Sequence, residues 1–335
     1  MEQLQLTLDL IEANGNEDAP DDELRALGVK IDQLKSQRCT AKIAAGSNGV
    51  VYTICSFFPC STCFAMKLSI LDKLDVEVAE FQINTQLFNA FHGNTYHYRA
   101  REYDLAAIVS KPIAYVKYIP SGDKPFHTII TGLLSGVSAN DLMTSDTVTK
   151  EEYMNILRGV FVFVAEATTR VPGFRHNDLH TGNVMVNGVQ VSVLDFGLSR
   201  TNVVQKVYVD SHVALMDCGN WDCWKFLGHA VYILFHHAEK RRTWAIQVLQ
   251  IIREFFNDDR AFVYFTQRRD MRLASTRLIM NATGSPFKMD VNYGCNTFYT
   301  PVYKLDDGRT MAISGFKEYN ARFPPTRFRN YFLRH

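Results

Sequence analysis

RHNDLHTGNVMVNGVQVSVLDFGLSR, residues 175–200, joins a polar loop to two short apolar runs. The runs are separated by Asn187-Gly188, and an Asn-Gly pair between apolar runs predicts a tight β-hairpin. A hairpin brings the chain back beside the point where it started. We therefore expect Asp178, Asn183 and Asp195 to lie close together.

The side chains of these three residues carry oxygen atoms that can bind a cation or accept a proton. Mg²⁺ prefers oxygen ligands, and proteins usually hold it through few carboxylates together with the phosphates of a nucleotide. Two of the three side chains can therefore hold Mg²⁺. The third can accept a hydroxyl proton.

The stretch resembles two motifs of the protein-kinase superfamily, the catalytic loop H-R-D-x-x-x-x-N and the metal-binding triplet D-F-G. Here the loop reads His176-Asn177-Asp178, Asn183 follows five residues after the aspartate, and Asp195 begins an intact triplet. The resemblance implies a bilobal α+β fold, with a small β-rich N-lobe and a mainly helical C-lobe, that uses ATP and Mg²⁺. It also implies that Asn183 and Asp195 are the metal ligands and that Asp178 accepts the proton of the acceptor hydroxyl.

The resemblance also divides the chain, whose 335 residues suit one large or two packed domains. It implies an N-terminal extension at 1–38, an N-lobe at 39–131, a C-lobe at 132–285 and a C-terminal extension at 286–335 that packs on the C-lobe.

The composition excludes several classes of protein. Apolar residues make up 47% and charged residues 21% of the chain, and the net charge of +1 predicts no strong nonspecific attraction to nucleic acid or anionic membranes. No apolar run approaches the roughly 20 residues of a membrane helix, and the acidic N-terminus is unlike a secretory signal. Seven cysteines, an odd number, predict reduced thiols in the cytosol or nucleus, in a host cell if the protein is viral.

A glycine-containing turn between two strand-like runs follows Lys42. Glycine lets backbone N–H groups approach phosphates closely. The turn is similar to the kinase pattern G-x-G-x-x-G-x-V, although Ala44 stands at the first glycine. The resemblance implies nucleotide contacts from Gly46, Ser47, Asn48, Gly49 and Val51.

Lys67 closes the next strand-like run, at the position where kinases carry the lysine that pairs with the α- and β-phosphates. Apolar residues then recur at helical spacing through 74–91. In the family this helix supplies a glutamate to the lysine. Glu80 fits that role best, and Glu77 is the alternative.

Strand-like stretches at 106–119 and 126–134 would complete the sheet. Ile130 falls at the gatekeeper position, and Thr131-Gly132-Leu133 falls at the hinge whose backbone groups bind adenine in the family. The remaining predicted nucleotide contacts are Ala65, Ile130, Thr131 and Leu133.

Three segments allow two interpretations each. The extension at 1–38 is either an arm packed on the small lobe, with a helix that begins at Asp21, or a docking segment for a partner. Cys60-Ser-Thr-Cys63, with Cys55 nearby, is either a loop of reduced thiols, which the lack of a second Cys pair favours, or a zinc site. The arginine- and aromatic-rich end is either a tail docked on the large lobe or a patch for RNA or a partner.

The large lobe is expected to be helical. Asp222, near the start of one of its helices, would brace the catalytic loop from beneath, and the chain from Met289 onward reads as strand and loop. Helices are predicted at 150–168, 220–235, 244–256 and 270–280.

Two loop residues depart from the usual kinase pattern. Asn177 stands where many kinases have an arginine that pairs with a phosphorylated activation loop, so we expect activity that does not depend on such phosphorylation. His180 stands where serine/threonine kinases usually have a lysine. This variant of the loop is more similar to haspin, to kinases of large DNA viruses, and to aminoglycoside and choline phosphotransferases.

We therefore expect a serine/threonine protein kinase in which Lys67, Asp178 and Asn183 are the catalytic residues. Its partners would be protein substrates with Ser or Thr, the chain itself among the candidates, and neither a membrane nor nucleic acid is expected as a partner. The alternatives are a small-molecule phosphotransferase of the same fold and a pseudokinase scaffold. The complete set of Lys67, Glu80, Asp178, Asn183 and Asp195 argues against the scaffold, and the string Asp-Phe-Gly-Leu-Ser-Arg favours protein acceptors.

Overall fold

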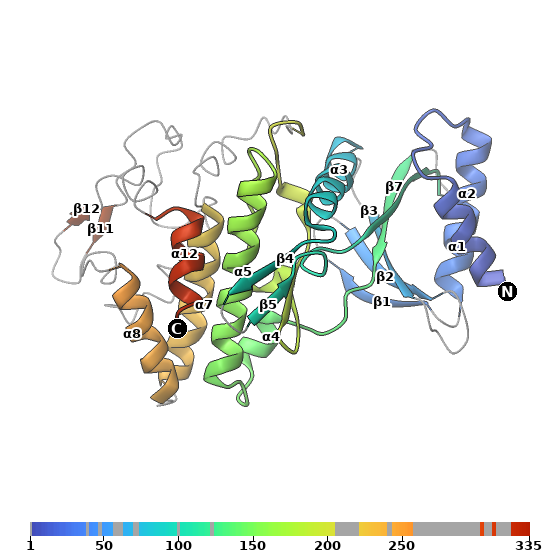
Figure 1. Ribbon diagram of the computed structural model, residues 1–335. Coiled ribbons are helices and arrows are strands. Elements are labelled where there is room, and N and C mark those ends of the chain that lie inside the picture. Colours follow the sequence, from blue (N-terminus) through green and yellow to red (C-terminus); the bar gives the residue numbers. More distant parts are fainter. Residues whose placement is uncertain are drawn as a thin grey trace.

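The computed structural model shows a mixed α+β chain, with an antiparallel sheet in the N-terminal part and helices after it (Figure 1). Among the residues that the structure describes, no helix is long and apolar enough to cross a membrane. The segment 205–220 and the predicted helix at 270–280 lie outside the described residues. The structure describes residues 2–37, 40–45, 49–55, 63–69, 74–98, 101–120, 124–204, 221–239, 243–256, 302–304, 310–312 and 323–335.

Five strands form the main sheet, in the order β1-β2-β3-β7-β6, with every neighbouring pair antiparallel. Each overlaps a stretch that the sequence predicted as a strand, although the strand predicted to end at Lys67 continues to Ser69. A separate hairpin of β4 (Thr95–Tyr98) and β5 (Arg101–Asp104) was not predicted. The strands of the main sheet are β1 (Thr40–Ala45), β2 (Gly49–Cys55), β3 (Cys63–Ser69), β6 (Pro112–Tyr118) and β7 (Phe126–Gly132).

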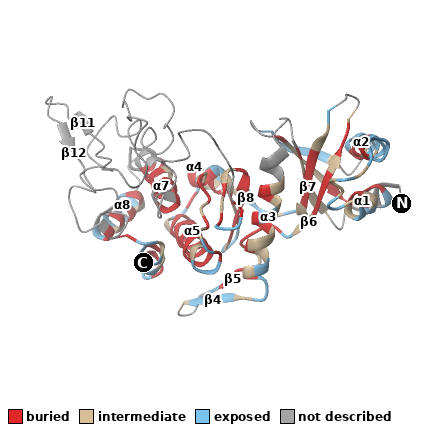
Figure 2. Ribbon diagram, turned by 90° about the horizontal axis from the view of Figure 1, so that it is seen from above, coloured by how far each residue is buried: buried red, intermediate tan, exposed pale blue. Residues whose placement is uncertain are grey.

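Helices cover both faces of this sheet (Figures 1 and 2). The helix α3 (Leu74–Phe91), whose predicted range is confirmed, lies on one face, and α1 (Glu2–Glu12) and α2 (Asp21–Ser36) lie on the other. Side chains alternate between the faces along a strand. Met66 therefore points into the core beneath α1 and α2, whereas Lys67 points toward α3.

The N-terminal extension belongs to the core of the sheet, which confirms the predicted arm packed on it. The helix α2 begins at Asp21 as expected, but the residue before it is Pro20 and no side chain caps the helix. Leucine stands at every second position in the first part of α1. Leucines four positions apart therefore lie one helical turn apart, on the same side of the helix. The apolar residues buried against the sheet from both helices are Leu6, Leu10, Leu27, Ile31 and Leu34.

The helix α2 approaches the end of β6 most closely at Gly28. A Cβ atom on this residue would lie 2.0 Å from the carbonyl oxygen of Ile119, whose own N–H donates to the Leu24 carbonyl at 2.9 Å. Replacing Gly by Ala inside a helix normally stabilises it by about 1 kcal/mol. We expect Gly28→Ala to lower the free energy of unfolding instead, by roughly 1–3 kcal/mol, because two backbones must move apart.

Urea unfolding of the intact chain checks this expectation. Val29→Ala is the matched control, because Val29 is the next residue of the same helix and is 59% exposed. A Gly28→Ala midpoint at or above that of the unsubstituted protein would mean that α2 is not seated against Ile119.

A second core gathers around α5 (Lys150–Arg170), which the sequence predicted at 150–168. The predicted hairpin after the polar loop is also present, and Val137–Ser138 (β8) adds a third strand to it. Its turn is one residue later than predicted, because Asn187 pairs with Gln190 and the exposed Val189 lies in the turn with Gly188. The other elements of this region are α4 (Ala139–Thr144), β9 (Val184–Asn187), β10 (Gln190–Val193), α7 (Trp221–Glu239) and α8 (Thr243–Phe256).

The C-terminal helix α12 (Pro325–Phe332) packs on α5 (Figure 1). Phe328 and Phe332, one turn apart, place their ring centroids 5.1 and 4.9 Å from that of Phe161. Docking of the tail was predicted and is confirmed for this helix, whereas the prediction of strand and loop is wrong for these residues. Earlier in the tail, β11 (Val302–Lys304) and β12 (Thr310–Ala312) pair as two short strands, in line with the predicted strand content.

Cys55 and Cys63 form a disulfide across β2 and β3, where they stand directly opposite each other. The prediction of reduced thiols in this loop is therefore wrong. The pairing follows from the register of two strands, which the spacing of cysteines in the sequence does not show. Cys60 lies outside the described residues, and the described part of the chain contains no group of three or more His, Cys, Asp or Glu side chains that could hold a metal.

Candidate active site

The first turn of α7 fixes the polar loop from below. The carboxylate of Asp222, which is 2% exposed, accepts hydrogen bonds from the backbone N–H groups of His176 and Asn177, both at 2.8 Å. A buried carboxylate with two backbone donors makes strong, charge-assisted hydrogen bonds. The predicted bracing of the loop by Asp222 is thus confirmed.

His176 joins the loop to the segment that follows β10. Its Nδ1 accepts from the N–H of Asp178 at 3.3 Å and its Nε2 lies 3.0 Å from the Leu194 carbonyl oxygen, so a proton on Nε2 satisfies both contacts. The ring packs against Phe196 at 5.3 Å, and the Ser199 hydroxyl donates to the His176 carbonyl at 3.1 Å. These contacts hold the start of the loop against the residues on either side of the D-F-G triplet.

Asn177 is a buried connection between the same two segments. Its backbone is left-handed, with φ of 64°, a conformation that Asn adopts more readily than most residues. Its side-chain amide donates to the Leu198 carbonyl at 2.9 Å. The residue at this position therefore ties the loop to the D-F-G segment.

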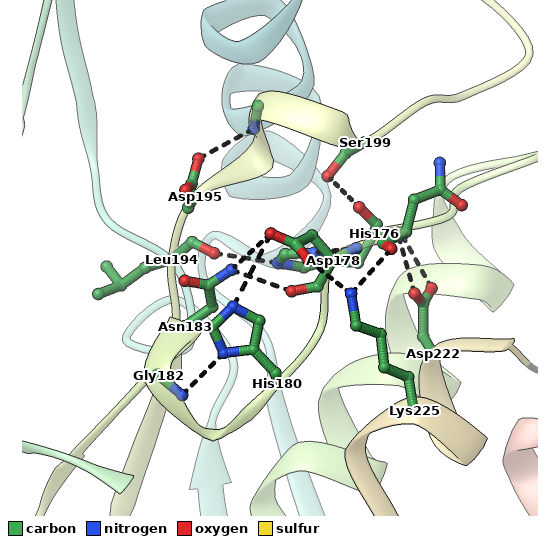
Figure 3. Close-up of polar contacts among 12 residues, drawn as sticks. His176, Asp178, His180, Gly182, Asn183, Leu194, Asp195, Ser199, Asp222 and Lys225 are labelled. Carbon is green, nitrogen blue, oxygen red and sulfur yellow. Dashed lines mark hydrogen bonds and ion pairs between the residues drawn. The ribbon is translucent and has the colours of Figure 1, made fainter. Parts of the chain in front are cut away.

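Asp178 lies at the centre of a polar cluster (Figure 3). Its Oδ1 is 2.5 Å from Nζ of Lys225 on α7. The side-chain amide of Asn183 donates to the Asp178 carbonyl at 2.9 Å and lies 3.4 Å from Oδ2, so the expected proximity of these two residues is confirmed. Nε2 of His180 is 3.8 Å from the same oxygen.

Lys67 connects β3 with α3 and with the D-F-G segment. Its ammonium donates to the two carboxylate oxygens of Glu80 at 2.9 and 2.7 Å and to Oδ1 of Asp195 at 3.1 Å. The expected ion pair between Lys67 and Glu80 is therefore present. Burial alone would lower the pKa of Lys67, but the negative charges of Glu80 and Asp195 outweigh it and hold the pKa above its ordinary value.

Asp195 is ionised in this arrangement. Burial would raise its pKa, but the charge and hydrogen bond of Lys67, together with the N–H of Gly197 at 3.3 Å, hold the pKa below its ordinary value. Its backbone has φ of 59°, a left-handed conformation that costs free energy in non-glycine residues and clusters at functional sites.

Asn183 and Asp195 fit the predicted magnesium site. The Asn183 carbonyl accepts from the N–H of Leu194 at 2.9 Å, which sets Asn183 beside the residue that precedes Asp195. One ionised carboxylate and one amide oxygen are few ligands, but Mg²⁺ takes most of its ligands from water and phosphate. These two side chains would hold the ion.

Several of the predicted nucleotide contacts share one face of the sheet with Lys67. Lys67 stands opposite Val51 and Ile129, and Ala65 stands opposite Thr131. Residues that are directly opposite in neighbouring strands lie on the same face. Val51, Ala65 and Thr131 therefore lie on the Lys67 face, as their predicted role requires.

Ile130 lies on the other face. It stands opposite Met66 and is completely buried in the core beneath α1 and α2. Its prediction as a nucleotide contact is wrong, because motif spacing located the strand but not the alternation of its side chains. Ile129 is the residue of this strand that lies opposite Lys67.

Two other predicted nucleotide contacts, Gly49 and Leu133, lie at the ends of strands. Gly49 begins β2, where a Cβ atom would lie 2.6 Å from the Leu68 carbonyl oxygen, so a larger residue would push β2 and β3 apart. Leu133 directly follows β7 and is 36% exposed. Gly46, Ser47 and Asn48 lie outside the described residues.

Lys225 is a site residue that the sequence reasoning missed. It follows Asp222 by three residues, so both side chains lie on the same side of α7. Because Asp222 was expected beneath the loop, a lysine one turn later could have been expected to reach the loop as well. The spacing of the two residues was present in the sequence, but its meaning became visible only once Asp222 had been placed beneath the loop.

Two neutral histidines border Asp178. His229 on α7 stacks on His180, with ring centroids 5.5 Å apart. Burial, followed by the charges of His180 and Lys225, lowers the pKa of His229 to about 4. Burial also lowers the pKa of His180, although the charge of Asp178 opposes this. Both imidazoles are therefore uncharged near pH 7.

Comparison with models of known protein families gave no match, and comparison with curated proteins gave none either. The functional interpretation therefore rests on these residues and their geometry.

Proposed function

We propose that this chain is an ATP-dependent serine/threonine protein kinase with a bilobal, kinase-like fold. The observation that carries the proposal is the bridge that Lys67 makes between two carboxylates. One belongs to Glu80 on α3, and the other to Asp195, which follows Lys67 by 128 positions. A lysine paired with a helix glutamate, next to the aspartate of D-F-G, is the arrangement that phosphoryl transfer in protein kinases requires. Separate sequence patterns predicted these residues: the strand motif predicted Lys67, the helix that follows predicted Glu80, and D-F-G predicted Asp195.

Each residue has a role in this proposal. Lys67 would bind the α- and β-phosphates of ATP and would be held in place by Glu80. Asn183 and Asp195 would hold Mg²⁺, which neutralises phosphate charge when it is bound. Asp178 would accept the proton of the acceptor hydroxyl. Positioning and charge neutralisation would supply most of the rate.

The arrangement of elements supports a two-lobed organisation. The sheet with α3 would form the N-lobe, 39–131, and the elements around α5 would form the C-lobe, 132–285. The loop with Asp178 belongs to the second part and Lys67 to the first, so ATP would be bound by residues of both.

The direct test is transfer of label from γ-labelled ATP, with Mg²⁺, to generic protein substrates, followed by phosphoamino-acid analysis. Phosphoserine or phosphothreonine is the expected product. Label on aminoglycosides or choline but not on protein would identify a small-molecule phosphotransferase. Tight nucleotide binding without transfer to any acceptor would identify a scaffold.

Activity is expected to be independent of phosphorylation of the activation segment. Asn177, at the position of the arginine that grips a phosphorylated segment in many kinases, is uncharged and is already bonded to the Leu198 carbonyl. Treatment with a broad-specificity phosphatase, followed by its removal, should leave the rate of transfer to protein unchanged. An enzyme that loses its activity on this treatment and regains it on incubation with ATP would contradict the prediction.

A further inference from the structure

Lys225 carries a positive charge into the interior beside Asp178 (Figure 3). Its side chain is 8% exposed, and its Nζ lies 2.5 Å from Oδ1 of Asp178 and 3.4 Å from the carbonyl oxygen of Asn177. Removing an ammonium from water is costly unless close partners compensate for it. An apolar side chain of similar length would avoid that cost. The presence of a charge at this buried position therefore has to be explained by what the charge does there.

Anchoring of the loop is not a sufficient reason. Asp222 already accepts from the backbone N–H groups of His176 and Asn177. Lys225, one turn later, reaches the carboxylate of Asp178. The helix α7 thus holds the loop at two points, the backbone through Asp222 and the functional side chain through Lys225.

The contact makes the two oxygens of Asp178 unequal. Oδ1 faces the ammonium at 2.5 Å, whereas Oδ2 lies 3.4 Å from the Asn183 amide nitrogen and 3.8 Å from Nε2 of His180. Both of the latter distances are long for hydrogen bonds. Oδ2 can therefore accept a hydrogen bond from a new donor, and the ion pair opposes any rotation of the carboxylate that would exchange the two oxygens.

The loop does not supply this charge itself. His180 stands two residues after Asp178, its Nδ1 accepts from the Gly182 N–H at 3.0 Å, and its ring stacks on His229. With its pKa lowered by burial, the imidazole is neutral near pH 7. The cation that pairs with Asp178 in the described part of the chain comes from α7.

We propose that Lys225 is a positioning residue for phosphoryl transfer: its ammonium fixes Oδ1 of Asp178, so that Oδ2 faces the acceptor hydroxyl. The inference rests on the proposed kinase function. In the transfer step the hydroxyl proton passes to Oδ2, the acceptor oxygen forms a bond to the γ-phosphorus, and the bond from that phosphorus to the bridging oxygen breaks and releases ADP. Lys225 keeps its proton throughout.

The first variant to test is Lys225→Met, which keeps the length of the side chain and removes its charge. We expect kcat to fall about 10- to 100-fold while KM for ATP changes by less than about threefold, because the lost contact orients Asp178 and does not bind nucleotide. Lys150→Met is the control, since Lys150 is a partly exposed lysine at the start of α5 whose ammonium donates to Gln247 on α8 at 2.9 Å. Its kcat should equal that of the unsubstituted protein.

The second variant separates positioning from a merely structural role. His180→Lys in the Lys225→Met background places an ammonium on the loop, two residues after Asp178, and should recover about tenfold of the lost kcat. His180→Lys alone should give no gain, because Oδ1 already has its cation. An independent readout is the pKa of His229, which the charge of Lys225 lowers. A proton NMR titration should show this pKa rising from about 4 in Lys225→Met.

Two results would overturn the inference while leaving the proposed function intact. One is an active protein in which Lys225→Met has an unchanged kcat. The other is a loss of kcat that follows a loss of folded protein in thermal unfolding and is not recovered by His180→Lys. An unsubstituted protein that transfers no phosphate to any acceptor would instead overturn the proposed function, and the inference with it.

Discussion

Asp178→Asn is expected to lower kcat for phosphoryl transfer about 1,000-fold, because general bases typically contribute between about 100- and 10,000-fold. Asparagine has the size of aspartate but cannot accept the proton of the acceptor hydroxyl. Nucleotide affinity should be retained, since Asp178 contacts Asn183 and Lys225 and takes no part in the bridge of Lys67 with Glu80 and Asp195. Initial rates at saturating ATP and a titration with a fluorescent nucleotide measure the two quantities separately.

Two controls make the result specific. Asp141→Asn makes the same chemical change at an exposed residue in the first turn of α4 and should leave kcat unchanged. Thermal unfolding must accompany the rates, because Asp178→Asn leaves the ammonium of Lys225 without its carboxylate partner. A folded Asp178→Asn protein that keeps more than about a tenth of the kcat would show that the proton goes elsewhere.

Local patterns were sufficient for much of the fold. The helical spacing of apolar residues predicted α3 at 74–91, and the Asn187-Gly188 turn predicted the hairpin that returns the chain to Asp178. Both depend on interactions within about 20 residues, which the sequence records directly. The Lys67–Glu80 ion pair, between residues 13 positions apart, was predicted because the family motif supplied the tertiary arrangement.

The missed features depend on how separate elements meet. Ile130 was assigned to the wrong face because the stretch 126–134 shows no regular alternation of apolar and polar residues, and only its pairing with β3 settles the direction of each side chain. The disulfide of Cys55 with Cys63 depends on register in the same way. The helix α12 is short, and it is stabilised by aromatic contacts with α5 more than by its own sequence.

In the candidate site, too, the residues within local motifs were predicted, and a residue that depends on how separate elements meet was missed. The loop motifs predicted Asp178, Asn183 and Asp195, which lie within 18 positions of one another in the printed sequence. Lys225 was missed because no motif that ends at D-F-G includes it, and its contact with Asp178 spans 47 positions. Residues of this kind become visible only after a helix has been placed beneath the loop.

Lys67→Met is expected to abolish measurable transfer and to lower stability as well. The substitution leaves Glu80 and Asp195 as two carboxylates without the cation that they share. Loss of its partner costs a buried polar group roughly 1–3 kcal/mol and a buried charge more. Because the side chain of Asp195 is 38% exposed, water offsets part of this cost, and the free energy of unfolding should fall by about 2 kcal/mol. The pKa of Asp195 should rise, because burial raises it and Lys67 is the main group that opposes burial.

A second substitution can restore stability without restoring activity. Glu80→Gln in the Lys67→Met background removes one of the two opposed charges, and removing both members of a buried pair costs less than removing one. We expect this double variant to regain about 1 kcal/mol of the lost stability while its transfer stays at background, since no lysine remains to bind the phosphates. Urea unfolding and rate measurements on the same preparations give both quantities. If activity returned together with stability, Lys67 would be a structural residue, and the bridge on which the proposed function rests would have no part in transfer.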